Sequence, residues 1–378
     1  MAVVGIIAEY NPFHNGHKRQ LDFARQVAQD DAIIVAMSGN WTQRGEPAII
    51  NKWQRAEAAI KNGADLVLEL PFNVTVQPAH LFAQGAVTLL HQLGVQKLVF
   101  GAEHPEMDFA RLVQNRPIEV EQFKRFDQTY ATAYQQHLTQ KTGIELRGSN
   151  DILGFTYALA NDRLGQPLEM VPLKREGAQH GDSSIRSGAT IASASSIRAA
   201  ALAGNFELVK PTVPESSYSF LEANSLVNWQ SFWPLLRYRI LTETPDTLRQ
   251  FYQMTEGIEY RLLDAAQRAI TIDEFLALVK TKRYTYTRIQ RLISYVLLNA
   301  STELMMTRLK SARVLAFNNR GRSQLNRLKS SQSLQLITKL TDDWQQGPYF
   351  LDNRVDELRR LLVRDESTSQ IKRPFYLK

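Results

Sequence analysis

Five short apolar runs, each followed by a stretch with helical period, set the strongest limit on how this chain folds. The runs are Val3–Ala8, Ala32–Met37, Leu66–Leu70, Lys97–Phe100 and Leu168–Leu173. The expected helices are His17–Asp30, Lys52–Asn62, Ala79–Leu93, Asp151–Asn161 and Ser195–Ala203. Strands that are apolar throughout and separated by helices are typical of a parallel sheet covered on both faces. We therefore predict an α/β fold with a Rossmann-like, doubly wound parallel sheet.

The length of 378 residues indicates two domains, because single hydrophobic cores stop growing at about 250–300 residues. Strand signals fade after a loop that carries Pro211 and Pro214. The helical periods that follow are Phe220–Leu241, Leu248–Ala269, Ile272–Val279 and Arg288–Met306. We predict a first domain at 1–209, with a helical insertion near 107–142, and a mainly α-helical domain at 210–378.

The absence of cysteine excludes disulfides, thiolate nucleophiles and zinc–thiolate sites. The apolar run at the N-terminus is short, lacks a basic flank and leads directly into Glu9, so it fits a buried strand and neither a signal peptide nor a membrane anchor. We expect a cytoplasmic protein without a membrane segment, and no obligate protein partner is evident.

Basic residues gather between Thr281 and Ser330. Eleven Lys and Arg residues face one acid, Glu303, so this stretch carries +10 while the whole chain carries +7. A solvated helix face is the alternative, but such faces usually mix signs. Tyrosines between arginines are typical of surfaces that stack unpaired RNA bases and contact phosphates. The predicted RNA-binding residues are Lys282, Arg283, Tyr284, Tyr286, Arg288 and Arg291, joined on the same surface by a turn with Arg320 and Arg322 and by Arg327 and Lys329.

The segment His14-Asn15-Gly16-His17 lies where the first strand turns into the first helix. Ligands of open α/β sheets bind beyond the carboxyl ends of the strands. Gly16 lets the backbone approach a phosphate, and the helix start offers free N–H groups. Taken singly, each histidine is explained as well by helix capping or by packing on Phe13. Together, His14 and His17 favour a site that donates hydrogen bonds to phosphate oxygens in the transition state.

His-x-Gly-His after a first strand resembles the signature of the nucleotidylyltransferase superfamily, whose members attack the α-phosphate of ATP and expel pyrophosphate. The second motif of that superfamily is a Ser-rich turn that opens a helix with a basic residue. Ile191-Ala192-Ser193-Ala194-Ser195-Ser196-Ile197-Arg198 is similar to it in pattern and in place. The resemblance implies that His14 and His17 are catalytic and that Ser195 and Ser196 contact the nucleotide.

Six longer segments, spread over nearly the whole chain, carry a closer resemblance. They are Ala8–His17, Met37–Pro47, Gly63–Pro71, Ser149–Gly154, Arg283–Arg291 and Arg313–Asn318. These segments resemble the bacterial tRNA(Met) cytidine acetate ligase family. The resemblance implies a ligase that activates acetate with ATP as acetyl-adenylate and transfers the acetyl group to the wobble cytidine of elongator tRNA(Met), giving N4-acetylcytidine. Mg²⁺ is expected with the ATP, and acetyl-CoA is not used.

The same resemblance assigns the ATP contacts. They are Ile7, Ala8, Glu9, Tyr10, Asn11, Pro12, Phe13, His14, Asn15, Gly16, His17, Lys18, Arg19, Gln20, Gly101, Asn150 and Arg175. Gly101 and Arg175 end strands and Asn150 precedes a helix, so all three belong to the sheet edge where ligands bind. For acetate we expect Asn40, Gln43 and Arg44, in the loop after the second strand. No carboxylate is assigned as a metal ligand.

Two other functions stay open from the sequence. A small-molecule nucleotidylyltransferase, which adenylylates a phosphorylated acceptor, shares both motifs but seldom has a second domain this basic. An RNA-binding protein with an inactive nucleotide site is the other alternative. The presence of both histidines is evidence against it.

Overall fold

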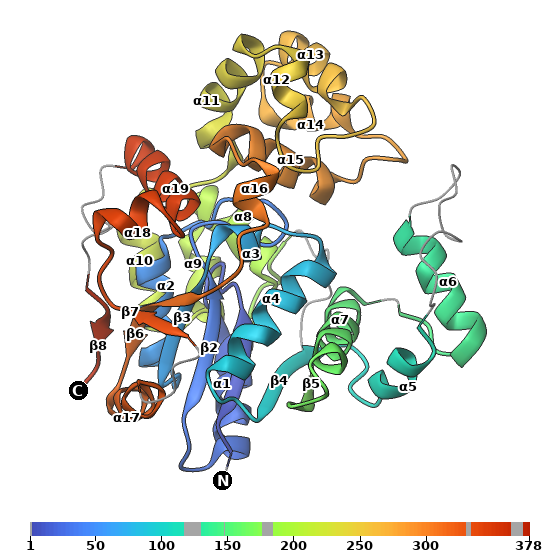
Figure 1. Cartoon of the computed structure of the whole chain (residues 1–378). Helices are drawn as coiled ribbons and strands as arrows, with labels where there is room; N and C mark the ends of the chain where they lie inside the picture. The colour runs from blue at the N-terminus through green and yellow to red at the C-terminus, as the bar shows by residue number, and fades with distance from the viewer. Residues whose placement is uncertain (1, 117–129, 147, 176–183, 330–333, 364–372) are drawn as a thin grey trace.

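The computed structural model describes residues 2–116, 130–146, 148–175, 184–329, 334–363 and 373–378 (Figure 1). A single eight-stranded sheet runs through the described residues, in the order β5-β4-β1-β2-β3-β6-β7, with β8 beside β6. The strands are β1 (Val4–Ala8), β2 (Ile33–Ser38), β3 (Leu66–Leu70), β4 (Lys97–Ala102), β5 (Glu169–Lys174), β6 (Ser311–Phe317), β7 (Gln335–Ile337) and β8 (Phe375–Tyr376). Strands β1 to β5 are the five predicted strands and run parallel, which confirms the predicted fold class.

Helices cover both faces of the sheet. In the first part of the chain they are α1 (Asn15–Ala28), α2 (Lys52–Lys61), α3 (Phe72–Thr75), α4 (Ala79–Gln92), α5 (Phe109–Gln114), α6 (Tyr130–Thr142), α7 (Ser149–Arg163), α8 (Ala194–Leu202), α9 (Phe206–Val209) and α10 (Glu215–Ala223). Alternate residues of a strand point to opposite faces. In β2, Val35 accordingly belongs to the same buried cluster as Leu21 of α1, whereas Ile34 belongs to the cluster that contains Phe82 of α4. The sheet is buried on both sides, as its apolar runs predict.

The strand order reverses between β1 and β4. From β1 the chain continues to β2 and β3 on one side of the sheet, and then crosses to β4 and β5 on the other. Open α/β sheets bind ligands at this reversal, beyond the carboxyl ends of the strands. The turn after β1, with the two histidines, lies there. α5 and α6 fall within the predicted insertion at 107–142, of which residues 117–129 lie outside the described residues.

A lobe of helices lies beyond the carboxyl ends of the central strands, at the top of Figure 1. It contains α11 (Trp229–Thr242), α12 (Pro245–Arg249), α13 (Ile258–Arg268), α14 (Ile272–Val279), α15 (Tyr286–Leu298) and α16 (Thr302–Met305). Phe232, Leu262, Phe275 and Ile293 are fully buried in its core. Trp41, from the loop after β2, belongs to the same core. None of the helices in the described part of the chain has the length and apolar character that a bilayer crossing needs.

The predicted unit at 210–378 is mainly helical, but after residue 310 the chain returns to the sheet of the first part. There β6, β7 and β8 join the sheet of the first part, and α17 (Asn319–Leu328), α18 (Asp342–Gln346) and α19 (Phe350–Leu362) accompany them. β6 pairs antiparallel with β3. Its sequence contains Arg313, which we assigned to the basic stretch. In the fold Arg313 is only 1% exposed, and its charge is met by Glu69 and Asp356. The ion pairs with Glu69 and Asp356 offset the charge of Arg313, so the segment can lie as a strand in the buried sheet.

Candidate active site

The two histidines are fixed by hydrogen bonds at the first turn of α1. His14 is the N-cap residue, and its Nδ1 accepts a hydrogen bond from the backbone N–H of Gly16 at 3.1 Å. In return, Nδ1 of His17 accepts from the backbone N–H of His14 at 3.3 Å. The rings are stacked, with centroids 3.7 Å apart. This is a capping box made of histidines. Because each Nδ1 is an acceptor, each neutral ring carries its proton on Nε2.

Burial keeps this pair uncharged. Desolvation, helped by the nearby charges of Arg175 and Arg198, lowers the pKa of His14 to about 3. Desolvation also holds the pKa of His17 well below its usual value, and the charges of His14 and Arg175 act in the same direction. At neutral pH both side chains are therefore neutral. Each ring therefore offers an oriented Nε2–H donor, a group that can stabilise an anion without bringing a charge of its own.

Aromatic packing shapes the turn between β1 and α1. Tyr10 and Phe13 are almost fully buried, and the ring of Tyr10 lies edge-on to both Phe13 and His17, with centroids 4.8 Å apart in each case. Tyr10 has a φ of 48°, in the left-handed region that few non-glycine residues adopt. Asn11 fixes the turn to the neighbouring segment, because its Oδ1 accepts from the N–H of Ile49 at 2.8 Å.

Two of the residues predicted to contact ATP, Asn15 and Gln20, connect α1 to neighbouring segments. Nδ2 of Asn15 donates to the carbonyl oxygens of Thr190 and Pro211, at 2.8 and 2.9 Å. Nε2 of Gln20 donates to the carbonyl oxygen of Val99 at 3.3 Å. These side chains are occupied by backbone partners. Their role in the described structure is to position the helix start.

Lys18 and Arg19, the two basic residues among the predicted ATP contacts at Ile7 to Gln20, differ in their surroundings. Lys18 forms an exposed ion pair with Asp22 at 2.7 Å, one helical turn away. Such exposed pairs contribute only about 0.3–0.5 kcal/mol, so Lys18 is readily released to another anion. Arg19 donates to the carbonyl oxygen of Lys174 at 3.1 Å, which links α1 to the end of β5.

The structure brings the Ser-rich motif to the histidine turn. Ser193 caps α8 by accepting from the N–H of Ser196 at 3.0 Å, and its Oγ lies 2.9 Å from Oγ of Ser195. Arg198, in the first turns of α8, donates from Nη1 to the carbonyl oxygen of Asn11 at 2.9 Å. The predicted motifs therefore meet at one place, although nearly two hundred residues separate them in the sequence.

Gly101, Asn150 and Arg175 also come together. Nη1 of Arg175 donates to Oδ1 of Asn150 at 3.2 Å, and a Cβ atom on Gly101 would lie 3.3 Å from Cγ of Arg175. Nδ2 of Asn150 donates to Oε1 of Glu103 at 2.6 Å. Glu103, which the sequence analysis missed, therefore orients the amide of Asn150. All three predicted residues lie at the carboxyl ends of β4 and β5 or beside them.

The side chains of the loop after β2 hydrogen-bond to distant parts of the protein. Asn40 is buried; its Nδ2 donates to Oδ1 of Asp356 at 2.8 Å, and its Oδ1 accepts from the N–H of Lys52 at 2.7 Å. Both ends of its amide thus have partners, which gives Asn40 a structural role. Nε2 of Gln43 donates to the carbonyl oxygen of Gln77 at 2.6 Å. Acetate contacts by Gln43 and Arg44 stay predictions.

Glu9 connects this loop with β1. Its Oε1 accepts from the backbone N–H of Gln43 at 2.7 Å. Burial raises the pKa of Glu9, and the hydrogen bond from Gln43 and the charge of Arg44 partly offset that rise. The carbonyl oxygen of Glu9 accepts from Arg55. The loop after β2 is therefore joined directly to the residue that precedes the histidine turn.

Known proteins resemble this chain over its full length. Residues 1–373 match the family model described as HIGH Nucleotidyl Transferase. A tRNA(Met) cytidine acetate ligase of Levilactobacillus brevis is 49% identical over 99% of both chains, and that of Lactiplantibacillus plantarum is 42% identical over 100% of this chain and 99% of its own. The chain belongs to the tRNA(Met) cytidine acetate ligase family. Crystal structures of Thermotoga maritima TmcAL, one without ligand and one bound with alpha-thio ATP, superpose over 100% of both chains with TM-scores of 0.90 and 0.88 at 28% and 27% identity.

In this member of the tRNA(Met) cytidine acetate ligase family, the helical lobe is hydrogen-bonded to the loop after β2. Nε1 of Trp229 and Oγ of Ser294 both donate to the carbonyl oxygen of Gly45, at 2.9 and 3.1 Å. Nε1 of Trp41 donates to Oγ of Ser294 at 2.8 Å. Gly45 has a φ of 82°, and a Cβ atom there would lie 2.5 Å from the backbone of Gln290 in α15. The loop and α15 are in direct backbone contact.

Gly45→Ala is expected to destabilise the protein by about 2–4 kcal/mol, because it combines a left-handed φ with a collision against helix backbone. Gly257→Ala is the matched control, since Gly257 has a φ of 76° but no atom within 4 Å of the added Cβ. It is expected to cost about 1 kcal/mol. Urea unfolding of both variants measures the difference. Equal losses of stability would show that the contact with α15 yields easily.

The predicted RNA-binding residues around the start of α15 are mostly accessible, with one exception. Lys282, Arg283 and Tyr286 are exposed, and Arg288 is partly so. Tyr284 is buried, and its hydroxyl donates to the carbonyl oxygen of Glu256 at 2.9 Å. The prediction that Tyr284 offers an exposed ring is wrong. Arg291 is partly buried, and its charge lies near His80 of α4.

Two of these arginines share an acid that the linear count of charges did not include. Arg283 and Arg288 each lie 3.2 Å from Oε2 of Glu256, which comes from the segment before α13. The charge excess of the basic stretch is therefore reduced at this surface. Arg288 also lies over the ring of Tyr284, 5.1 Å from its centroid.

Arg320, Arg322, Arg327 and Lys329 do not share this surface. They lie on α17 or directly after it and not in a turn, and Figure 1 shows α17 at the end of the sheet opposite to α15. The reason is packing at Gly321, where an added Cβ would collide with the carbonyl oxygen of Asp65 before β3. The prediction of one continuous basic surface is wrong.

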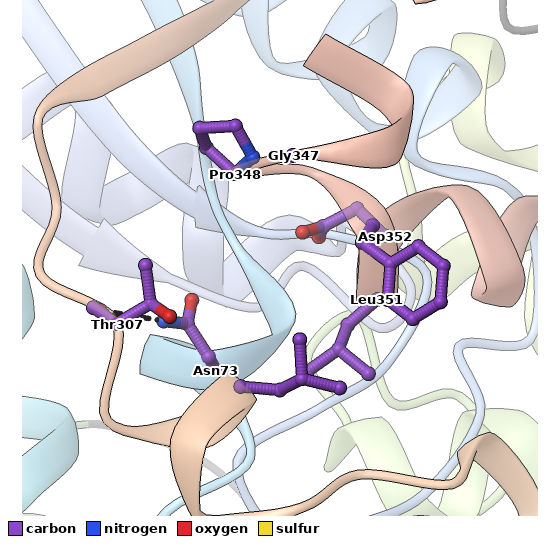
Figure 2. Close-up of a pocket in the computed structure, with 8 residues that line it drawn as sticks. Asn73, Thr307, Gly347, Pro348, Leu351 and Asp352 are labelled. Carbon is purple, nitrogen blue, oxygen red and sulfur yellow. Dashed lines mark hydrogen bonds between the residues drawn. The ribbon is translucent and has the colours of Figure 1, made fainter. Parts of the chain in front are cut away.

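A cavity of about 290 Å³ lies away from the histidine pair, between α3, α16 and the start of α19 (Figure 2). Its lining residues are Asn73, Leu304, Thr307, Gly347, Pro348, Phe350, Leu351 and Asp352. Asn73 donates to the carbonyl oxygen of Thr307 across one side of it. None of the residues that line it was predicted to bind ATP, acetate or RNA. The candidate active site is thus the turn after β1 and its neighbours.

Proposed function

We propose that this protein activates acetate with ATP as acetyl-adenylate and transfers the acetyl group to N4 of the wobble cytidine of elongator tRNA(Met), giving N4-acetylcytidine. As a member of its family it is an ATP-dependent ligase. The observation that carries the proposal is the neutral, capped pair of His14 and His17 at the start of α1.

In the first step, a carboxylate oxygen of acetate attacks the α-phosphorus of ATP. A new P–O bond forms, the bond to the bridging oxygen breaks, and pyrophosphate leaves. The reacting groups must lie in line, with acetate opposite the leaving group. Nε2–H of His14 and of His17 would donate to phosphate oxygens on which negative charge builds up. Arg175 and Arg198 would bind the same phosphate chain, since guanidinium groups match phosphate geometry.

In the second step, N4 of the cytidine attacks the carbonyl carbon of acetyl-adenylate. A C–N bond forms, the C–O bond to AMP breaks, and the nitrogen loses one proton. No acetyl-CoA enters this scheme, because acetate and ATP supply the activated acyl group.

Mg²⁺ would enter with the triphosphate. Within the described residues, no group of three Asp, Glu or His side chains is arranged to hold a metal ion. Mg²⁺ usually binds through substrate phosphates and waters with one or two carboxylates. The side chains of this chain would then bind the phosphates and leave most of the metal's ligands to ATP and water.

RNA binding is proposed for the exposed residues at the start of α15, with α17 left out because of its distant position. Arg283→Ala is expected to weaken tRNA binding and to lower the slope of log K against log salt by about one, as for the loss of one phosphate contact. Arg268→Ala is the control, because Arg268 is an exposed arginine of α13 paired with Asp264. Binding is measured by filter retention at several salt concentrations. A slope unchanged by Arg283→Ala would contradict the proposed surface.

The activity is tested with labelled acetate, ATP and bulk tRNA, followed by nucleoside analysis. ATP-dependent label in N4-acetylcytidine is the expected result. Acetate-dependent exchange of pyrophosphate into ATP without label in RNA would retain activation and refute the proposed acceptor. The absence of both would favour an RNA-binding protein, and adenylylation of a small phosphorylated acceptor would favour the other class of nucleotidylyltransferase.

A further inference from the structure

Three polar contacts connect α15 with the histidine turn. Nε2 of Gln290 in α15 donates to Oε1 of Glu46 at 3.2 Å. Oε2 of Glu46 accepts from Nη2 of Arg198 at 3.2 Å. Nη1 of Arg198 donates to the carbonyl oxygen of Asn11 at 2.9 Å. The two oxygens of one carboxylate are thus divided between the helical lobe and the arginine of the Ser-rich motif.

Glu46 is held in this place by its own backbone. Its N–H and its carbonyl oxygen both hydrogen-bond with Thr42, and Trp41 pairs with Pro47 across the loop. Gly45 next to it lies against the backbone of α15. A movement of α15 would therefore carry Glu46 with it. The ion pair is partly shielded from water, with side-chain exposures of 30% for Glu46 and 24% for Arg198.

The guanidinium of Arg198 is planar, so partners at two of its nitrogens fix the direction of the whole group. Asn11 holds one side and Glu46 the other. Loss of Glu46 leaves Arg198 free to rotate about a single hydrogen bond at the turn. A small misplacement of a group that orients reacting atoms can lower a rate by about 10²-fold.

We propose that Glu46 is a positioning residue of the adenylation step. It fixes the orientation of Arg198 at the histidine turn and links that orientation to RNA binding at α15. The inference rests on the proposed function. Linkage of two sites is reciprocal: if tRNA changes the affinity for ATP by a given factor, ATP changes the affinity for tRNA by the same factor.

The first measurement is acetate-dependent ATP–pyrophosphate exchange without tRNA. Glu46→Gln keeps the size of the side chain and removes its charge. We expect kcat to fall by about tenfold and KM for ATP to change by less than about threefold, because an orienting group acts mainly in the transition state. Glu46→Asp, which keeps the charge, is expected to recover part of kcat. Loss of kcat in Glu46→Gln without recovery in Glu46→Asp would indicate a packing defect and overturn the role of the charge.

The second measurement is the Kd of ATP with and without tRNA, in the absence of acetate. The wild-type protein is expected to show a change of about fivefold, within the usual range of coupling. Gln290→Leu removes the side-chain contact from α15 to Glu46 and keeps the backbone contact at Gly45, so it should keep kcat without tRNA and weaken the effect of tRNA on ATP binding. A wild-type Kd that tRNA does not change, or coupling in Gln290→Leu as large as in the wild type, would overturn the link.

The two hypotheses fail in different ways. A wild-type protein that binds ATP but shows no acetate-dependent exchange would contradict the proposed function. In that case the Kd of ATP with and without tRNA, compared between the wild type, Glu46→Gln and Gln290→Leu, would still test the link between α15 and the histidine turn.

Discussion

His14→Asn and His17→Gln are each expected to lower kcat of acetate-dependent pyrophosphate exchange by about 10²–10³-fold, the usual effect of removing one donor to a developing charge. Both variants keep the helix start. Asparagine at His14 still accepts from the N–H of Gly16, and glutamine at His17 still accepts from the N–H of His14, as in an ordinary capping box. The variants therefore keep the cap and remove the imidazole ring with its Nε2–H donor and its aromatic contacts.

Measurements of unfolding distinguish the role of His14 as a catalytic donor from its role as the cap of α1. His14→Ala loses the cap as well as the donor, so urea unfolding should show a further loss of about 1 kcal/mol against His14→Asn. The double variant is expected to be only slightly slower than either single one, because residues that act as a unit are not additive. If His14→Asn retained half of the wild-type kcat, the histidine would be a cap and not a catalytic donor.

Lys52→Met is expected to destabilise the fold by about 3–5 kcal/mol, the cost of leaving buried charge without its partner. Nζ of Lys52 lies 2.7 Å from Oε1 of Glu69 and 2.9 Å from Oδ2 of Asp356, and all three side chains are at most 1% exposed. Arg313 is the second cation of this cluster. Burial, followed by the charge of Glu69, raises the pKa of Asp352 to about 8, so that carboxyl is largely neutral at pH 7. Two cations thus face two carboxylates, and the substitution breaks the balance.

Lys61→Met is the matched control on the same helix. Lys61 pairs with Glu57 at 2.7 Å, but its side chain is 42% exposed. Exposed pairs contribute about 0.2–1 kcal/mol, so this variant should unfold at nearly the wild-type urea concentration. Equal midpoints for Lys52→Met and Lys61→Met would mean that Glu69 and Asp356 find other partners.

The sequence predicted those parts of the fold that depend on local pattern. Runs such as Leu66–Leu70 identified the central strands even though Glu69 interrupts the apolar residues. His14 and His17 were found because a strand, a turn and a helix start follow each other within a few residues. In such segments, local preference and tertiary structure agree.

The errors concern residues whose environment is set by distant segments. Asn40 was expected to contact acetate, but its amide donates to Asp356 of α19. Arg313 looked like part of a basic surface, but it is buried against Glu69. Glu46 lay within a segment that resembles the family, yet only the fold shows that it faces Gln290 and Arg198. The periodicity of a single sequence does not show which residues far apart in the chain pair with each other.

The position of β6 has a consequence for how the protein is made. β3 emerges from the ribosome early, but its neighbour β6 follows only after more than two hundred further residues. At a synthesis rate of about 5–20 residues per second, β3 waits for tens of seconds as an open sheet edge, with Glu69 not yet facing Arg313. Open edges tend to pair with other chains. The nascent chain thus passes through an interval in which the β3 edge is open to such pairing, and this interval ends when β6 has been synthesised.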